Sequence, residues 1–344
     1  PRHLTGTGYT FLGLPELRTA LAERYTRRGT PTSPDEILVT TGAQQAIYLV
    51  LASFVGPGER VVVEHPAYPH AISAVRGVGG RPVPVPVGVG GVDLDLLEST
   101  IRQSAPRVVH LTPDFHNPTG TSLDAAARER LREIAARHRT LVVGDETLTD
   151  LALDGAGPPC FLGAAPGPHL LAIGSASKSF WGGLRVGWVR ARRDVVARLG
   201  QERARHDLST GLLDQLVTLE LLGEQETVLA ERRAELRGRR DALVAALARE
   251  LPWTHELPAG GLSLWADLGA PLSSTLAAVA PQHGVLVSPG TIFGVDGAFE
   301  NRMRLPFSAD VDRIDRGVAA LAAAWHSLDA GSRPGRRPQD AVLV

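Results

Sequence analysis

Short apolar runs rich in β-branched residues recur along the first half of the chain and alternate with stretches of helical character. The seven runs with the composition of strands are 37–41, 61–64, 81–87, 108–112, 141–145, 170–175 and 186–190. The pattern predicts helices near 43–55, 68–76, 93–105 and 124–138. Pro34 suits a first helical turn, and Asp93 and Asp124 suit N-caps. Strands that alternate with helices favour a mostly parallel sheet covered on both faces, an α/β fold.

After Arg190 the pattern becomes helical, with a long stretch rich in Ala, Glu, Arg and Leu at about 225–251. A β-rich run at 261–267, a helix near 272–283 and a run at 303–307 then predict an α+β module. We therefore expect a large domain over 30–235 and a smaller α+β domain over 236–328 that is joined by the N-terminal residues 1–29. The tail 329–344, rich in Gly, Pro and Arg, is predicted to be disordered.

Length and composition agree with a large domain plus a smaller one, because 344 residues exceed what one small core needs. The net charge of −1 gives no basic surplus for nucleic-acid binding by this chain alone. No apolar run approaches the roughly 18 residues of a membrane helix, and no charged-then-apolar leader opens the chain. Cys160 is the only cysteine, which excludes an internal disulfide, fits a cytoplasmic protein and suits a small apolar filler.

Lys178 is the only lysine among 36 Lys and Arg residues. Arg serves wherever a positive charge suffices, but its guanidinium stays protonated and does not attack a carbonyl. The lone lysine is therefore a candidate imine former, or a chance survivor of compositional drift. Composition alone favours neither interpretation.

The segment Ser175-Ala-Ser177-Lys178-Ser-Phe-Trp-Gly-Gly-Leu-Arg185 follows directly on a predicted strand. It places an amine at the carboxyl edge of a sheet, where ligands of α/β proteins bind. The hydroxyls of Ser175 and Ser177 and the guanidinium of Arg185 are the kinds of donor that a phosphate group requires.

Three further motifs follow predicted strands. His116-Asn117-Pro-Thr-Gly is a turn signature by itself, and the strand-terminal Asp145 in Gly-Asp-Glu-Thr is by itself also typical of a helix cap. Thr41-Gly-Ala43-Gln44 leads from a strand into a helix whose first N–H groups are able to bind a phosphate.

Other chemistries lack their motifs. The glycines at 77–80 and 88–91 have neither the length nor the strand-to-helix setting of a nucleotide loop, and no His-Glu-x-x-His or Gly-x-Ser-x-Gly sequence occurs. His65 and His70 are interpreted as loop polar residues, so no metal site is predicted.

Together these motifs resemble the class I/II aminotransferases of pyridoxal 5′-phosphate (PLP) fold type I, over about residues 5–325. Within that family, the segments 8–18 and 180–185 look most like the aminotransferase-like domain of MocR-type regulators. The resemblance implies a seven-stranded, mostly parallel sheet and PLP as the cofactor.

The resemblance also implies roles for individual residues. Lys178 would form the Schiff base, Asp145 would pair with the pyridine nitrogen, Asn117 would bind the phenolic oxygen and the substrate carboxylate, and Tyr68 would stack on the ring. The phosphate would be held by the amides of Ala43 and Gln44 and by Ser175, Ser177 and Arg185. Arg304 would bind the α-carboxylate, and Tyr9 would reach the phosphate of the neighbouring subunit, although its spacing to Gly13 is one residue shorter than the family pattern.

One position departs from the family. The third residue after the pyridine aspartate is commonly a tyrosine that donates to the phenolic oxygen, and here it is Leu148, which has no donor. This puts efficient transamination in doubt more than cofactor binding.

Two hypotheses follow. The first is a homodimeric aminotransferase that converts an α-amino acid and a keto acid through Lys178. The second is the ligand-sensing and dimerising half of a PLP-dependent transcription regulator whose DNA-binding domain is absent from this chain. Pro1, in place of Met, leaves room for a preceding segment.

Overall fold

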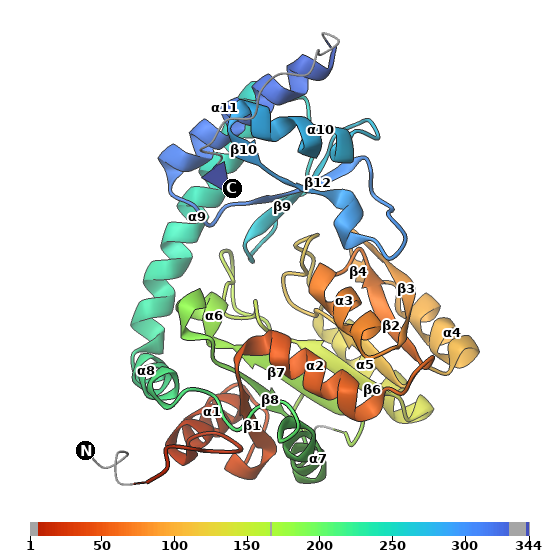
Figure 1. The fold of residues 1–344 in the computed structure, drawn as a ribbon, viewed down its shortest axis with the longest axis vertical. Helices are drawn as coiled ribbons and strands as arrows, with labels where there is room; N and C mark the ends of the chain where they lie inside the picture. The colour runs from red at the N-terminus through yellow and green to blue at the C-terminus, as the bar shows by residue number, and fades with distance from the viewer. Residues whose placement is uncertain (1–5, 166, 330–341, 344) are drawn as a thin grey trace.

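The computed structural model describes residues 6–165, 167–329 and 342–343, and it is built around one eight-stranded sheet (Figure 1). The strand order is β1-β8-β7-β6-β5-β2-β3-β4. The strands are β1 (Ile37–Thr40), β2 (Arg60–His65), β3 (Arg81–Gly88), β4 (Gly91–Val92), β5 (Val108–Leu111), β6 (Leu141–Asp145), β7 (Leu170–Ser175) and β8 (Gly187–Arg190). The five central strands β3, β2, β5, β6 and β7 are parallel, whereas β8 is antiparallel to both β7 and β1.

Helices cover both faces of the sheet. On one face lie α2 (Gly42–Phe54), α3 (Pro69–Gly77) and α7 (Arg193–Arg203), and on the other lie α1 (Pro15–Arg27), α4 (Leu94–Ser104), α5 (Ala125–His138) and α8 (Leu212–Gly223). Neighbouring strand residues belong to different clusters: Val62 and Val109 pack with α1, α4 and α5, while Val61 and Val108 pack with α2 and α3. This alternation is the two-residue period of a strand that is buried on both faces.

Local sequence explains where several helices begin. The carboxylate of Asp93 accepts hydrogen bonds from the backbone N–H groups of Asp95 and Leu96, and that of Asp124 accepts one from Ala127. Both predicted N-caps are therefore confirmed. Pro34 starts a short 3₁₀ helix, η1 (Pro34–Glu36), and the carboxylate of Glu36 accepts the backbone N–H of Ser33 at 2.9 Å.

The rest of the chain forms a second lobe with its own core. Its antiparallel sheet has the order β11-β12-β9, with β9 (Ser263–Asp267), β11 (Ser288–Pro289) and β12 (Arg302–Pro306). The helices of this lobe are α10 (Ser273–Val279), η3 (Ala280–His283), η4 (Gly290–Phe293) and α11 (Val311–Asp329). The 26-residue helix α9 (Gln225–Glu250) runs from α8 up to this lobe, as Figure 1 shows. Leu236, Leu243 and Leu247 of α9 join the core of the lobe.

The predicted α/β fold is confirmed, with differences in detail. The sheet has an eighth strand, the two-residue β4, which pairs only with β3. Helix α1 does not pack with the second lobe: Leu17, Leu21 and Tyr25 are buried in the core of the large sheet with Val39 of β1. The expected grouping of residues 1–29 with the small domain is thus wrong for the described part of that segment, because its apolar face matches the large sheet.

Most of the tail predicted to be disordered, 330–341 and 344, lies outside the described residues. Asp329 ends α11, and Val342–Leu343 (β13) pairs in parallel with β10 (Val285–Leu286). Across the described ranges, no helix is both long and apolar enough to cross a membrane.

Candidate active site

A cavity of about 540 Å³ lies between the carboxyl ends of the central strands and the second lobe. Ten of the residues predicted for the site line this cavity: Ala43, Gln44, Tyr68, Asn117, Asp145, Ser175, Ser177, Lys178, Arg185 and Arg304. The large sheet explains the convergence, because parallel strands end at the same edge. Asp145 is the last residue of β6 and Ser175 the last of β7, and Lys178 follows in the short helix α6 (Ala176–Ser179). Arg304 comes from β12 of the second lobe.

Two glycines shape one end of the cavity. Gly42 has a φ of +79°, and a Cβ there would lie 2.7 Å from an Nη atom of Arg185. A Cβ on Gly187 would meet the backbone of Gly42 and Ala43 at 2.5–2.6 Å. Only glycine lets the start of α2 and the arginine come this close to β8. The first N–H groups of a helix and a guanidinium at one point form a site for an anion.

Several polar atoms around the cavity are buried without a hydrogen-bond partner in the described structure. They are Oδ1 of Asn117, Oγ of Ser177 and Oε1 of Gln44. Buried polar atoms in native proteins nearly always have partners, so a ligand is the expected source of theirs. The hydroxyl of Ser175, in contrast, already donates to the carbonyl of Val186 at 3.2 Å and accepts the N–H of Ser177 at 3.1 Å. Of the two predicted serine donors, Ser177 is therefore the one left available.

Asp145 is a buried carboxylate with little compensation. Burial raises its pKa, and Glu64 adds to this, while His110 and hydrogen bonds from Thr147 lower it. The Thr147 N–H lies 3.0 Å from Oδ1, whereas Nε2 of His110 lies 4.0 Å from Oδ2. A cationic group in the cavity would favour the ionised form of this carboxyl.

Lys178 lies among positive charges. Its side chain is exposed at the cavity, yet partial desolvation and then Arg304, Arg185 and Arg232 lower its pKa, against a smaller raising effect of Asp145. A lowered pKa increases the fraction of neutral amine, which is the nucleophilic form.

Arg304 is the second cation with an unusual setting. Burial lowers its pKa to about 10, so it remains charged at neutral pH. Its Nε donates to Oγ of Ser263 at 3.1 Å, and no acidic partner occurs among the described residues. Tyr68 lies between the charged groups: burial and Asp145 raise its pKa, while Arg304 and Arg185 lower it. A half-buried guanidinium with both Nη groups free suits a carboxylate ligand.

Two predicted positions need comment. Tyr9 is 59% exposed and lies outside the cavity of its own chain, so its expected role toward a neighbouring subunit stays a prediction. Leu148 lines the cavity and packs in the core of the second lobe with Leu151 and Phe115. The position that lacks a donor is thus at the cavity, as the sequence predicted.

Sequence reasoning missed three residues that matter here. His110, beside Asp145, is the single polar residue in the buried run of β5, and that contrast was a usable signal. His70, interpreted as a loop residue, lines the cavity, where its ring contacts Tyr68 edge to face at 5.2 Å. Ser263 carried no signal, because nothing in one sequence pairs it with Arg304.

Comparison with known proteins gives a consistent result. The model of the aminotransferase class I and II family matches residues 5–321. A 2-aminoadipate transaminase from Thermus thermophilus is 36% identical over 303 residues, which cover 86% of this chain and 76% of that protein. The uncharacterized HTH-type transcriptional regulator YisV of Bacillus subtilis is 29% identical over 320 residues, which cover 91% of this chain and 66% of the regulator.

Among solved structures, the chain is similar to LysN, an α-aminoadipate aminotransferase from Thermus thermophilus complexed with N-(5′-phosphopyridoxyl)-L-leucine. The TM-score is 0.89 at 34% identity, with 96% of this chain and 87% of the other covered.

Proposed function

Since the chain belongs to the class I and II aminotransferases and is a PLP-dependent transferase, we propose a specific reaction for it. The protein transfers the amino group of an α-amino acid to a 2-oxo acid through Lys178. The observation that carries the proposal is the pairing of groups at one cavity. The only lysine of the chain and a half-buried arginine without an acidic partner in the described residues line the same 540 Å³ space. An amine for the cofactor and a fork for a carboxylate are what an amino-acid substrate requires.

The residues present fit PLP. The glycine-shaped end at Gly42 and Gly187, with Arg185, suits the phosphate. The unpartnered oxygens of Asn117 and Ser177 lie where a polar ligand would satisfy them. The buried carboxylate of Asp145 has a raised pKa because its neighbours do not offset the effect of burial, so it suits a protonated pyridine nitrogen.

We assign the roles accordingly. Lys178 would hold the cofactor, Asp145 would pair with its ring nitrogen, and Tyr68 would cover its ring. Asn117 would bind the phenolic oxygen. The phosphate would be held by the amides of Ala43 and Gln44, by Ser177 and Arg185, and by Ser175, whose hydroxyl also contacts the backbone.

When bound, PLP supplies an electron sink that stabilises negative charge at the substrate Cα. The residues of the chain do the rest. Arg304 orients the carboxylate of the amino acid, with Ser263 holding its Nε and leaving both Nη groups for the two oxygens. Lys178, whose lowered pKa favours the neutral amine, accepts the Cα proton as a general base. An ionised carboxylate of Asp145 would keep the ring nitrogen of the bound cofactor protonated.

The test uses the purified protein with added PLP. Visible absorbance of a lysine imine, fixation of one PLP per chain by borohydride on Lys178, and loss of that absorbance on addition of amino acids are expected. Amino acids of different side-chain class, each with 2-oxoglutarate or pyruvate as acceptor, measure turnover. A protein that stays colourless and takes up no PLP contradicts the proposal.

We further propose a homodimer. Exposed apolar side chains gather where α8 lies beside the loop after α6: Leu213 and Val217 of α8 are 77% and 48% exposed, and Trp181 is 68% exposed. A second copy would bury this surface. Sedimentation is expected to give a mass near twice 36.5 kDa, and Leu213→Asp with Val217→Asp to give monomers. Leu257→Asp, at a 57% exposed leucine outside this surface, is the control. A wild-type monomer at micromolar concentration contradicts the dimer.

A second candidate function rests on the similarity to YisV, which extends over 91% of this chain. In it, the chain is the effector-binding half of a regulator, and Leu148 reflects binding with little turnover. Substrate-dependent colour changes with turnover near zero would favour this candidate, whereas multiple turnovers with a keto acid favour the enzyme.

A further inference from the structure

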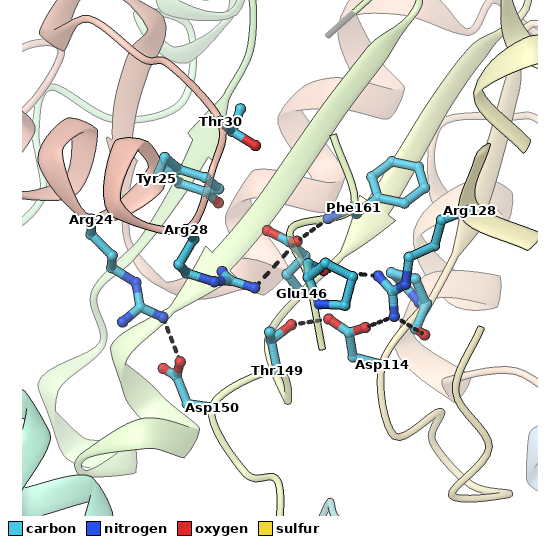
Figure 2. Close-up of polar contacts among 12 residues, drawn as sticks. Arg24, Tyr25, Arg28, Thr30, Asp114, Arg128, Glu146, Thr149, Asp150 and Phe161 are labelled. Carbon is cyan, nitrogen blue, oxygen red and sulfur yellow. Dashed lines mark hydrogen bonds and ion pairs between the residues drawn. The ribbon is translucent and has the colours of Figure 1, made fainter. Parts of the chain in front are cut away.

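The turn that follows β6 has two faces with different chemistry. Asp145, Thr147 and Leu148 line the cavity. Glu146, Thr149 and Asp150 of the same turn do not line it and instead join a cluster of polar contacts with Arg24, Arg28, Asp114 and Arg128 (Figure 2). Glu146 and Thr149 are 6% and 4% exposed, and the side chain of Asp150 is 12% exposed. The groups on this inner face are therefore part of the protein interior.

Asp150 uses both of its carboxylate oxygens. Oδ1 lies 2.5 Å from Nη2 of Arg24 in α1, as Figure 2 shows. Oδ2 accepts the hydroxyl of Ser179 at 2.6 Å. Ser179 is the residue directly after Lys178 in α6, and it is only 2% exposed. One carboxylate thus connects the turn that carries Asp145 to the turn that carries Lys178.

The same connection is reinforced from α9. Nε of Arg233 donates to the carbonyl of Asp150 at 2.6 Å, and Nε of Arg232 donates to the carbonyl of Lys178 at 2.9 Å. Arg24 is itself fixed by Gln225, whose Oε1 accepts its Nη1 at 2.8 Å. Helices α1 and α9 therefore hold the two turns as one unit.

The charge of Asp150 is maintained in this setting. Burial alone would raise its pKa, but Arg24, the Ser179 hydroxyl and Arg28 outweigh burial and hold the pKa below its usual value. An ionised carboxylate is a stronger acceptor for the serine hydroxyl than a neutral group.

We propose that Asp150, held by Arg24, is a positioning residue that fixes Lys178 relative to Asp145 through the hydroxyl of Ser179. The proposal rests on the proposed function, because it assigns Lys178 to PLP. It deepens that function by naming groups outside the cavity that set the geometry of the lysine.

Position should be visible in the titration of the lysine. The pKa of Lys178 is lowered by partial desolvation, Arg304, Arg185 and Arg232 and raised by Asp145. A shift of α6 by a fraction of an ångström changes the distances to these charges, and so changes the pKa of an imine formed at that nitrogen. Loss of a hydrogen bond elsewhere in the turn after β6, without a link to α6, would leave the distances from Lys178 to these charges unchanged.

The experiment compares four variant holoproteins with the wild type by absorbance against pH and by steady-state kinetics with one amino acid. In Ser179→Ala, we expect the imine pKa to shift by about 0.5 unit and kcat to fall roughly 10-fold with KM little changed. Ser179→Thr keeps the hydroxyl, so its imine pKa and kcat are expected to equal those of the wild type. Asp150→Asn, which keeps the shape of the acceptor, is expected to show a change in the same direction as Ser179→Ala.

Thr149→Val is the matched control. It removes a hydroxyl-to-carboxylate bond of the same kind, from Thr149 to Asp114 in the same turn, and neither side chain has a hydrogen bond to α6 in the described structure. If Thr149→Val shifts the imine titration as far as Ser179→Ala does, the effect is general loosening and the positioning role is wrong. If Ser179→Ala does not fold, Asp150→Asn provides the test instead. An imine pKa in Asp150→Asn equal to that of the wild type then overturns the proposal. Wild-type protein that binds no PLP would instead refute the proposed function itself.

Discussion

Arg128 is fully buried and Arg304 is half-buried, and the two arginines differ in how their donors are satisfied. The guanidinium of Arg128, 1% exposed, donates to Asp114 and to the carbonyls of Leu123, Pro113 and Pro159. That of Arg304 has one partner in the described structure, Ser263, and no acid. Two aspartates show the same contrast. Asp114 binds Arg128 through one oxygen and Thr149 through the other (Figure 2). Oδ2 of Asp145, in contrast, has only the imidazole of His110, 4.0 Å away.

The two regions, the charged cluster beside the turn after β6 and the cavity, differ in whether their polar groups have partners within the chain. Beneath the cavity, charges are matched within the chain, which fixes the turn after β6. At the cavity, charges and polar atoms are left for a ligand. Unpartnered buried polar groups are uncommon in native proteins, and a ligand-binding site is one place where they are expected. The first three predictions below each change one member of the matched or the unmatched set, and the last adds a donor at the cavity.

The largest effect is expected for Lys178→Ala. It removes the nucleophile and the proton carrier together, so turnover should fall by at least ~1,000-fold and the imine absorbance should vanish. PLP is still expected to bind through the phosphate end, measured by equilibrium dialysis. Lys178→Arg keeps a positive charge but forms no imine, and is expected to be equally inactive. Visible imine absorbance in either variant would show that another group captures the cofactor.

Asp114→Asn tests the matched set. It leaves Arg128 buried without its charge partner, which typically costs about 3–5 kcal/mol of unfolding free energy. Urea unfolding of the apoprotein measures the loss. Asp95→Asn removes one of the two acidic partners of Arg130, at a side chain that is 85% exposed, and should cost less than ~1 kcal/mol. Equal losses in both variants would mean that burial of the Asp114 pair has no energetic consequence.

Arg304→Lys tests the unmatched set. Lysine lacks the two parallel donors, so the variant should lose about 2–3 kcal/mol of α-amino-acid binding and far less for simple amines such as phenethylamine. Spectral titration with both ligand classes gives the affinities. Arg302→Lys is the control, since Arg302 lies on the same strand but pairs with Asp267. Equal losses for amino acids and amines would place the carboxylate site elsewhere.

The elements that sequence predicted well are those whose signal is local. The seven predicted strands match β1, β2, β3, β5, β6, β7 and β8 within two residues at each end, because short β-branched runs between turns carry their own boundaries. The caps Asp93 and Asp124 are equally local. The cavity-lining residues were found because most of them lie in contiguous motifs at strand ends.

What sequence missed depends on pairing across the chain. Arg24 and Asp150 are 126 positions apart, and one sequence contains nothing that links them. The packing of α1 on the large sheet depends on the shape of a surface formed by β1 and α8, which no periodicity encodes. β4 is too short to have a pattern and exists only through pairing with β3.

The smallest effect is expected at Leu148, where the cavity lacks a donor that its family commonly has. A hydroxyl bonded to the phenolic oxygen favours the phenolate and so promotes proton loss from the lysine imine. With leucine, the imine pKa should be higher, and the protonated, visible-absorbing form should persist through neutral pH and above. Leu148→Tyr should lower that pKa by about 1 unit, equivalent to ~1.4 kcal/mol. Absorbance titration with and without amino acid measures it.

Leu148→Phe is the control for this change, because it adds the ring without the hydroxyl. Leu148 is only 7% exposed and packs with Leu151, so either ring has to displace neighbours, and overpacking typically costs about 1–3 kcal/mol of stability. A pKa shift in the tyrosine variant alone isolates the donor from the packing. Faster turnover together with the shift would mark an enzyme limited by the missing hydroxyl, and a shift with turnover still near zero would favour the effector-binding role. If both variants fold, bind PLP and titrate like the wild type, another group already supplies the donor.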